Sequence, residues 1–137
     1  MPEPHQSTHH VSGGVRVILR IEGLALFVLG TGLYFATGAP WWLFIILLLA
    51  PDLSFLGYLA GPRIGAAAYN AAHSLIGPIA LGAVGFYVAT MPLLLSVAFA
   101  WLAHVGIDRA LGFGLKYASG FSDTHLGRIG RSASAAQ

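Results

Sequence analysis

The chain contains no cysteine among its 137 residues. Disulfides, thiolate metal sites, iron–sulfur clusters and cysteine nucleophiles are therefore excluded. Charge is also scarce, because only 9% of the residues are Asp, Glu, Lys or Arg, against about 25% in soluble domains. So few charged groups cannot cover the surface of a water-soluble globule, which predicts that lipid covers part of this one.

Apolar residues and glycine are what the chain has in abundance, with 56% hydrophobic residues and 18 glycines. Small residues let membrane helices approach closely. A membrane helix needs roughly 20 mostly apolar residues, and four stretches qualify: 17–37, 41–60, 64–89 and 92–111. Because short connections join them, consecutive helices should be antiparallel neighbours. The sequence predicts an all-α fold, a four-transmembrane-helix up-down bundle over residues 16–111.

The seven cations predict the orientation of this bundle. They occur before or at the start of the first stretch, between the second and third, and at the end of the fourth or after it: Arg16, Arg20, Arg63, Arg109, Lys116, Arg128 and Arg131. A four-helix topology places all of them on one side, and the positive-inside rule makes that side, with both termini, cytoplasmic. Topology explains the cations better than a nucleic-acid partner does, so no nucleic acid is expected.

Two flanking segments complete the organisation. Residues 1–15 are polar. This composition predicts a disordered tail whose histidines are solvated. Residues 112–137 predict a cytoplasmic juxtamembrane segment and tail. A cleaved signal peptide is the alternative for residues 17–37, but this stretch is longer than a signal core of about 7–15 residues, and cleavage would break the agreement of the charges.

Ionisable side chains within the predicted spans are the main functional signal, because each costs about 2.5–3.5 kcal/mol on insertion scales. Counting from the cytoplasmic ends of the helices at about 1.5 Å per residue puts Asp52 and His73 some 13 Å deep, and His104 about 10 Å deep. Asp108 lies one turn nearer the surface, on the same face as His104, and Asn70 shares a face with His73. These side chains should converge in the cytoplasmic half of the bundle.

Two imidazoles and two carboxylates are a suitable ligand set for one divalent ion, Zn²⁺ or Mn²⁺, with Asp52, His73, His104 and Asp108 as ligands. An open coordination position would make bound water a nucleophile near neutral pH. Candidate general bases are Glu22, Asp123 and His125, and candidate phosphate partners are Arg63 and Arg128. The alternative is an Asp–His hydrogen-bonded network that packs the helices, at about 0.6 kcal/mol for each contact. Haem ligation by His73 and His104 is a further alternative.

Several runs carry a resemblance that covers nearly all of residues 16–130: Pro51-Asp52-Leu53-Ser54, Ala68-Tyr69-Asn70-Ala71-Ala72-His73-Ser74, Trp101-Leu102-Ala103-His104-Val105-Gly106-Ile107-Asp108-Arg109 and Asp123-Thr124-His125-Leu126-Gly127-Arg128. The chain resembles a family of small bacterial membrane proteins known as domain of unknown function 4260. That resemblance implies a bacterial cytoplasmic (inner) membrane protein and no particular activity.

A more distant resemblance follows from the order Pro-Asp, His-Ser and His-x-x-x-Asp, which is similar to the membrane-bound metal-dependent hydrolases of the YdjM type. It implies that Asp52, His73, His104 and Asp108 bind metal. This chain has Ser54 where that family has a second acid, and Ala72 where it has threonine. With one acid fewer, a single metal is favoured over a two-metal centre.

Three functions remain open from the sequence. The first is a metal-dependent hydrolase that acts on a lipid or other amphiphile, with residues 112–130 folded back over the cytoplasmic mouth of the bundle. In the alternative, that segment only binds anionic lipid heads. The second is a small proton-coupled transporter with Asp52 and His73 as the relay, which would need a homodimer. The third is a structural or partner protein of the bilayer without enzymatic activity.

Overall fold

The structure, a computed structural model, describes residues 13–88, 91–117 and 123–128, and only the backbone of Asp123, Gly127 and Arg128. Its elements are α1 (Gly13–Ala36), α2 (Trp41–Leu49) continued by the 3₁₀ helix η1 (Ala50–Ala60), α3 (Pro62–His73), α4 (Ile76–Ala83) continued by the π-helical turn η2 (Val84–Val88), α5 (Pro92–Leu111), β1 (Asp123–Thr124) and β2 (Gly127–Arg128). Most of the described residues are thus helical, and the two named strands form one short antiparallel pair. Residues 1–12 of the predicted tail lie outside the described residues, and residues 13–15 form the start of α1.

Three helices are long and apolar enough to cross a membrane: Gly13–Ala36, Trp41–Ala60 and Pro92–Leu111. A fourth span results if α3 and the α4–η2 helix, which are bent by 45° relative to each other, are counted together. Large apolar side chains face outward, among them Leu59 at 88% and Ile76 at 78% exposure. Length and composition therefore indicate a membrane protein with three or four spans, two of which, 41–60 and 92–111, have the predicted bounds.

The stretch predicted as the third span, residues 64–89, is broken into two helices. The helix stops at His73, and the backbone of Ser74 is extended, with φ −83° and ψ 156°. Pro78 supplies the reason, because proline has no N–H to donate and its ring clashes with the carbonyl of the residue four positions earlier, which is Ser74. At the third position of α4, Pro78 itself is tolerated. The break places His73 at the very end of α3.

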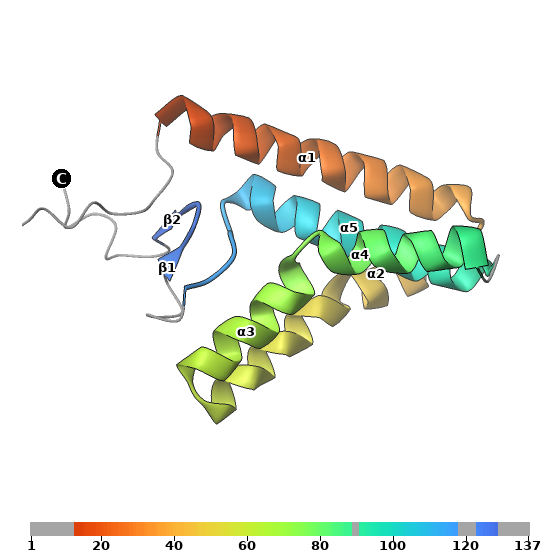
Figure 1. Ribbon diagram of the computed structural model, residues 1–137. Helices are drawn as coiled ribbons and strands as arrows, with labels where there is room; N and C mark the ends of the chain where they lie inside the picture. Colours follow the sequence, from red (N-terminus) through yellow and green to blue (C-terminus); the bar gives the residue numbers. More distant parts are fainter. Residues whose placement is uncertain (1–12, 89–90, 118–122, 129–137) are drawn as a thin grey trace, which may run out of the picture.

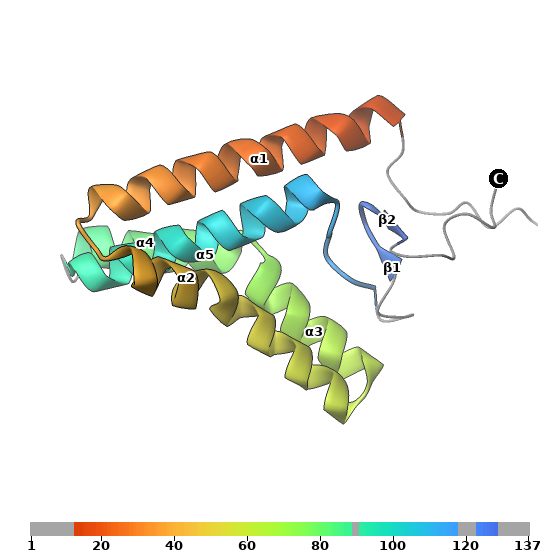
Figure 2. The same cartoon turned by 180° about the vertical axis from the view of Figure 1, so that it is seen from behind.

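The helices form two groups in space (Figures 1 and 2). α1 and α5 lie side by side and run in opposite directions, with α2 and α4 also against α5, whereas α3 lies beside η1 and both slant away from α1. A buried cluster of Tyr34, Phe44, Ala100 and Ala103 fills the space between α1, α2 and α5. The two groups meet near the break after His73, so residues from both can face one another there.

Glycine makes the close contact of α1 with α5. A Cβ added at Gly30 would lie 2.7 Å from the backbone nitrogen of Ala103 and 2.8 Å from the carbonyl oxygen of Phe99. At Gly23, an added Cβ would lie 2.6 Å from the backbone nitrogen of Ala110. At such distances the two helices would have to separate.

Gly30→Ala is therefore expected to destabilise the protein by roughly 1–3 kcal/mol, the usual cost of overpacking. Gly32→Ala is the matched control, because an added Cβ there meets nothing within 4 Å. Thermal unfolding of the two variants in the same detergent measures the difference. Equal midpoints would contradict the packing of α1 against α5.

After α5 the chain turns back toward the helices. Gly112 adopts a left-handed conformation with φ +94°, and the N–H of Phe113 donates to the carbonyl of Asp108 at 2.8 Å. Lys116 then pairs with Thr124 in an isolated antiparallel bridge. Phe113 and Tyr117 lie in this part of the chain outside any helix. These residues after α5, 112–117 and 123–128, form a returning segment that covers one end of the helices.

Candidate metal centre

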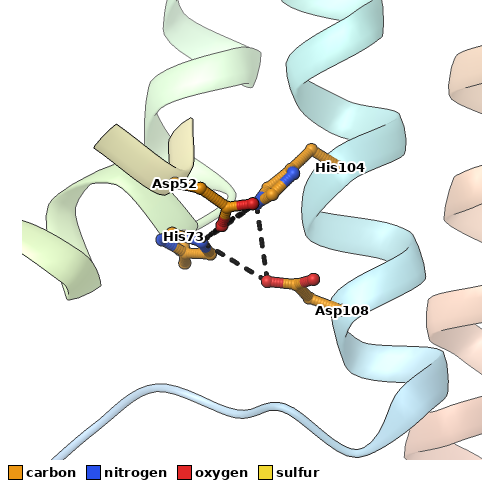
Figure 3. Close-up of side chains that lie close together, drawn as sticks. All are labelled: Asp52, His73, His104 and Asp108. Carbon is orange, nitrogen blue, oxygen red and sulfur yellow. Dashed lines mark hydrogen bonds and ion pairs between the residues drawn. The ribbon is translucent and has the colours of Figure 1, made fainter. Parts of the chain in front are cut away.

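Four ligand-type side chains from three helical segments meet at one point (Figure 3). Asp52 comes from the first turn of η1, and His73 is the last residue of α3. His104 and Asp108 lie one turn apart on α5. One nitrogen or oxygen atom from each of the four lies within 4.8 Å of the others. The convergence inferred from depth along the helices is present, and this group could hold a metal ion.

The distances from each imidazole Nε2 to the other three ligand atoms are close to those around a tetrahedral ion. The Nε2 atoms of His73 and His104 each lie 3.4 Å from Oδ1 of Asp52, and 3.3 and 3.4 Å from Oδ2 of Asp108. The two Nε2 atoms are 2.9 Å apart. Four ligands about 2.0–2.1 Å from a tetrahedral ion stand about 3.3 Å from one another. Small adjustments of the four side chains would bring the ligand atoms to tetrahedral spacing.

The imidazoles are oriented by backbone carbonyls. Nδ1 of His73 lies 2.9 Å from the carbonyl oxygen of Tyr69, to which only an N–H can donate, so the Nε2 that faces the other ligands is left with its lone pair. The ring of His104 has a backbone hydrogen-bond partner at Leu48. Metal-binding histidines commonly donate their outer N–H in this way. With the two Nε2 atoms 2.9 Å apart, a porphyrin has no room between them, which disfavours haem ligation.

The side chains of the four residues differ in how far they are exposed. The side chains of His73 and His104 are 3% and 4% exposed, and that of Asp108 is 19% exposed. The side chain of Asp52 is 42% exposed. The imidazoles thus form the inner wall, and the Asp52 side is open to the surroundings. The accessible side of the centre is therefore the one beside Asp52.

Trp101 and Tyr69 hold the centre together, and sequence reasoning did not assign either a role. The indole N–H of Trp101 donates to the carbonyl of Ala72, in the last turn of α3, where a helix leaves carbonyls without intrahelical partners. Gly77 makes room for the Trp101 ring, which an added Cβ would strike. Tyr69 stacks on His73 with ring centroids 3.8 Å apart. In the sequence, Trp101 lies three residues before His104 and therefore on the same helix face, and this spacing could have indicated its role.

Asn70 joins α3 to the returning segment. Its side-chain amide donates to the carbonyl of Lys116 at 2.7 Å and accepts from the Lys116 N–H at the same distance. Asn70 therefore pairs with a backbone and does not reach the four-residue group. Burial lowers the pKa of the Lys116 ammonium, and the carboxylate of Asp108 opposes that effect. Lys116 was missed as a site residue because this contact joins residues far apart in sequence.

The remaining predicted site residues lie elsewhere. Glu22 and His125 line a small cavity of about 90 Å³ together with Arg109, and none of the four ligand-type residues lines it. Nδ1 of His125 accepts the N–H of Leu115 at 2.9 Å. Burial, and then the charge of Arg109, lower the pKa of His125. The ring thus has a local role in holding the returning segment.

Arg63 is exposed in the first turn of α3, about 15 Å along that helix from His73. The backbones of Asp123 and Arg128 pair with each other across β1 and β2, while their side chains lie outside what the structure describes. The structure therefore brings together four of the ten predicted site residues.

Comparison with protein families adds one finding to this geometry. The family model described as domain of unknown function (DUF4260) matches residues 16–129. The chain belongs to the DUF4260 family. The match spans all five α-helices except the first residues of α1, and it includes each of the four converging residues. No curated protein and no solved structure matches this DUF4260 chain.

Proposed function

We propose that the protein is a metal-dependent hydrolase of the bacterial cytoplasmic membrane, with one zinc or manganese ion held by Asp52, His73, His104 and Asp108. The observation that carries this proposal is the convergence of four ligand atoms within 4.8 Å of one another, with each imidazole Nε2 2.9–3.4 Å from the other three. Nitrogen and oxygen ligands together favour zinc or manganese over calcium or magnesium, which prefer oxygen alone.

The proposed topology has both termini in the cytoplasm. The lysine and arginines lie near the same ends of the spans: Arg16 and Arg20 near the start of α1, Arg63 at the start of α3, Arg109 in the last turn of α5, and Lys116, Arg128 and Arg131 after α5. The side chain of Arg20 donates from Nε to the carbonyl of Ala110 at 2.8 Å, so the start of α1 and the end of α5 lie together. The positive-inside rule makes this end cytoplasmic. The centre then faces the cytoplasmic leaflet.

The chemistry proposed is addition of water to an ester or phosphoester of an amphiphile. A bound divalent ion supplies Lewis acidity and lowers the pKa of a coordinated water toward about 7. Asp52, the most exposed of the four, is placed where the ester would enter. The oxygen of water bonds to carbon or phosphorus, the ester bond to the alcohol breaks, and the alcohol leaves with a proton from that water. Water is the only co-reactant.

Incubation of the protein in nanodiscs of bacterial polar lipids tests this function. With Zn²⁺ or Mn²⁺, mass spectrometry should detect a lipid cleavage product that Asp108→Asn forms at least about 100-fold more slowly. Glu3→Gln is the matched control, because it removes a carboxylate from the N-terminal tail. Product formation that is equal in Asp108→Asn, or absent with every lipid class, would refute hydrolysis.

A transporter is the second candidate, and the breaks in the helices favour it. Asp52 lies where α2 gives way to η1, and His73 lies directly before the extended Ser74. Interrupted helices at a polar site are typical of transporters. Uptake of radioactive zinc or manganese into proteoliposomes distinguishes the two, since a hydrolase would leave uptake at the level of empty vesicles.

A further inference from the structure

Near its start, α1 carries two arginines, and this end of the helix extends past the end of α5 (Figures 1 and 2). Arg16 and Arg20 are four residues apart and so lie on the same face of α1. Arg20 donates from Nε to the carbonyl of Ala110 at 2.8 Å. A Cβ added at Gly112 would lie 3.8 Å from Nη2 of Arg16. Both guanidinium groups are therefore near the residues that end α5.

Neither arginine has an ion pair with a carboxylate among the described residues. Glu22, the acidic residue of α1, is two positions beyond Arg20 and so points to another side of the helix. There it lines a cavity with Arg109 and interacts with that residue electrostatically. The carbonyls at the end of α5 offer only about half of a negative charge. The pair of arginines therefore keeps most of its positive charge.

The hydrogen bonding of the two guanidinium groups is incomplete. Nε of Arg16 is buried and has no hydrogen-bond partner in the part of the chain that the structure describes. A buried donor without a partner costs free energy, and more so when the group is charged. Arg20 uses one of its five N–H groups on Ala110. Phosphate fits both needs, because it carries negative charge and its oxygens accept paired bonds from a guanidinium fork.

Exposed apolar side chains continue from the arginines along α1. They recur every three or four residues and so form a stripe beside the arginine face. The stripe consists of side chains that are 50–62% exposed: Val17, Ile21, Leu24 and Val28. Because α1 is long and apolar enough to cross a membrane, the stripe faces lipid chains. An anion at the arginines that also carries an acyl chain can place that chain on the stripe.

We propose that Arg16 and Arg20 form a binding site for an anionic phospholipid. Its phosphate bridges the two guanidinium groups, and one of its acyl chains lies along the apolar stripe of α1. The bound lipid joins the start of α1 to the end of α5, the helix that carries His104 and Asp108. This site does not depend on a metal ion, so it stands or falls separately from the proposed hydrolase.

Native mass spectrometry of the full chain in detergent with EDTA tests this site. Wild-type protein is titrated with phosphatidylglycerol and with phosphatidylcholine of the same acyl chains, and it should bind the anionic lipid more tightly. Loss of a charge-assisted hydrogen bond should weaken the binding of phosphatidylglycerol by at least about 10-fold in Arg16→Gln and in Arg20→Gln. Arg63→Gln is the matched control, because it removes an exposed cation at the start of α3, and it should bind as the wild type does.

The variants separate a built site from diffuse attraction. Equal binding of phosphatidylglycerol by wild type and Arg16→Gln refutes the site. A loss in Arg63→Gln as large as that in Arg16→Gln means that any cation at this end of the protein attracts the lipid, and it refutes the site as well. Arg16→Gln should fold normally, because the Nε that it removes has no partner among the described residues. If it does not fold, Arg20→Gln decides by the same criterion.

A second arm tests whether the ligand is a lipid. Inorganic phosphate and glycerol 3-phosphate at millimolar concentration carry the charge without a chain, so they should leave phosphatidylglycerol bound. Complete displacement by either would make this a site for a soluble anion and overturn the proposal. Wild-type spectra that show dimers without bound lipid would mean that a second copy of the chain covers the stripe, which would also overturn it.

Discussion

Replacement of His73 by alanine is expected to reduce the metal content of the purified protein from about one equivalent per chain to near zero. His73 is buried, and its Nε2 lies 2.9–3.4 Å from the other three ligand atoms. Removal of this ligand leaves one nitrogen and two oxygens, and affinity for Zn²⁺ should fall by at least about 100-fold. Elemental analysis by mass spectrometry measures it, on protein purified with a tag that contains no histidine. His104→Ala should behave in the same way.

The histidines of the N-terminal tail supply the control for this experiment. His5, His9 and His10 bind metal loosely if they bind it at all, and they could be mistaken for a site. A triple alanine variant at these three positions should keep its equivalent of metal. If the triple variant loses the metal and His73→Ala retains it, the centre described above is wrong.

The second large effect is expected on stability. A ligand that binds only the folded state at a thousand times its dissociation constant adds about 4 kcal/mol to the free energy of unfolding. Zn²⁺ should therefore raise the unfolding midpoint of the wild type in detergent above its value in EDTA by several degrees. Asp108→Asn is similar in shape, keeps a hydrogen-bonding side chain and loses one ligand charge, so its midpoint should be nearly the same in Zn²⁺ and EDTA.

This comparison separates a metal centre from a polar network that merely packs the helices. In such a network the Asp–His contacts act without metal, so wild type and Asp108→Asn would differ by the same amount in both buffers. Glu3→Gln is the control for the loss of a carboxylate. A wild-type midpoint that does not respond to Zn²⁺ or Mn²⁺ would favour the network.

The site was predictable to the extent that it depends on depth within a span. Hydropathy gives the ends of each span, and a helix advances about 1.5 Å per residue, so positions along the chain place Asp52, His73 and His104 at one level. The spacing of His104 and Asp108 gives a common face directly. The same reasoning could not show that the Nε2 atoms face each other, because that depends on the carbonyl of Tyr69.

The break after His73 and the returning segment were harder to predict. The clash of Pro78 with the carbonyl of Ser74 follows from local geometry, so the sequence contains enough information to predict this bend. The pairing of Asn70 with Lys116 joins residues 46 positions apart, and no local pattern reports such a contact. His125 was expected over the centre but lies in a cavity with Glu22 and Arg109, because its ring nitrogen pairs with the backbone of Leu115.

X-ray absorption at the zinc edge of the loaded protein tests the central claim most directly, that Asp52, His73, His104 and Asp108 surround one ion. The account predicts a four-coordinate ion with two imidazole nitrogens and two oxygens at about 2.0–2.2 Å, and loss of one imidazole contribution in His104→Ala. A six-coordinate spectrum of oxygen ligands alone, unchanged in His104→Ala, would contradict it.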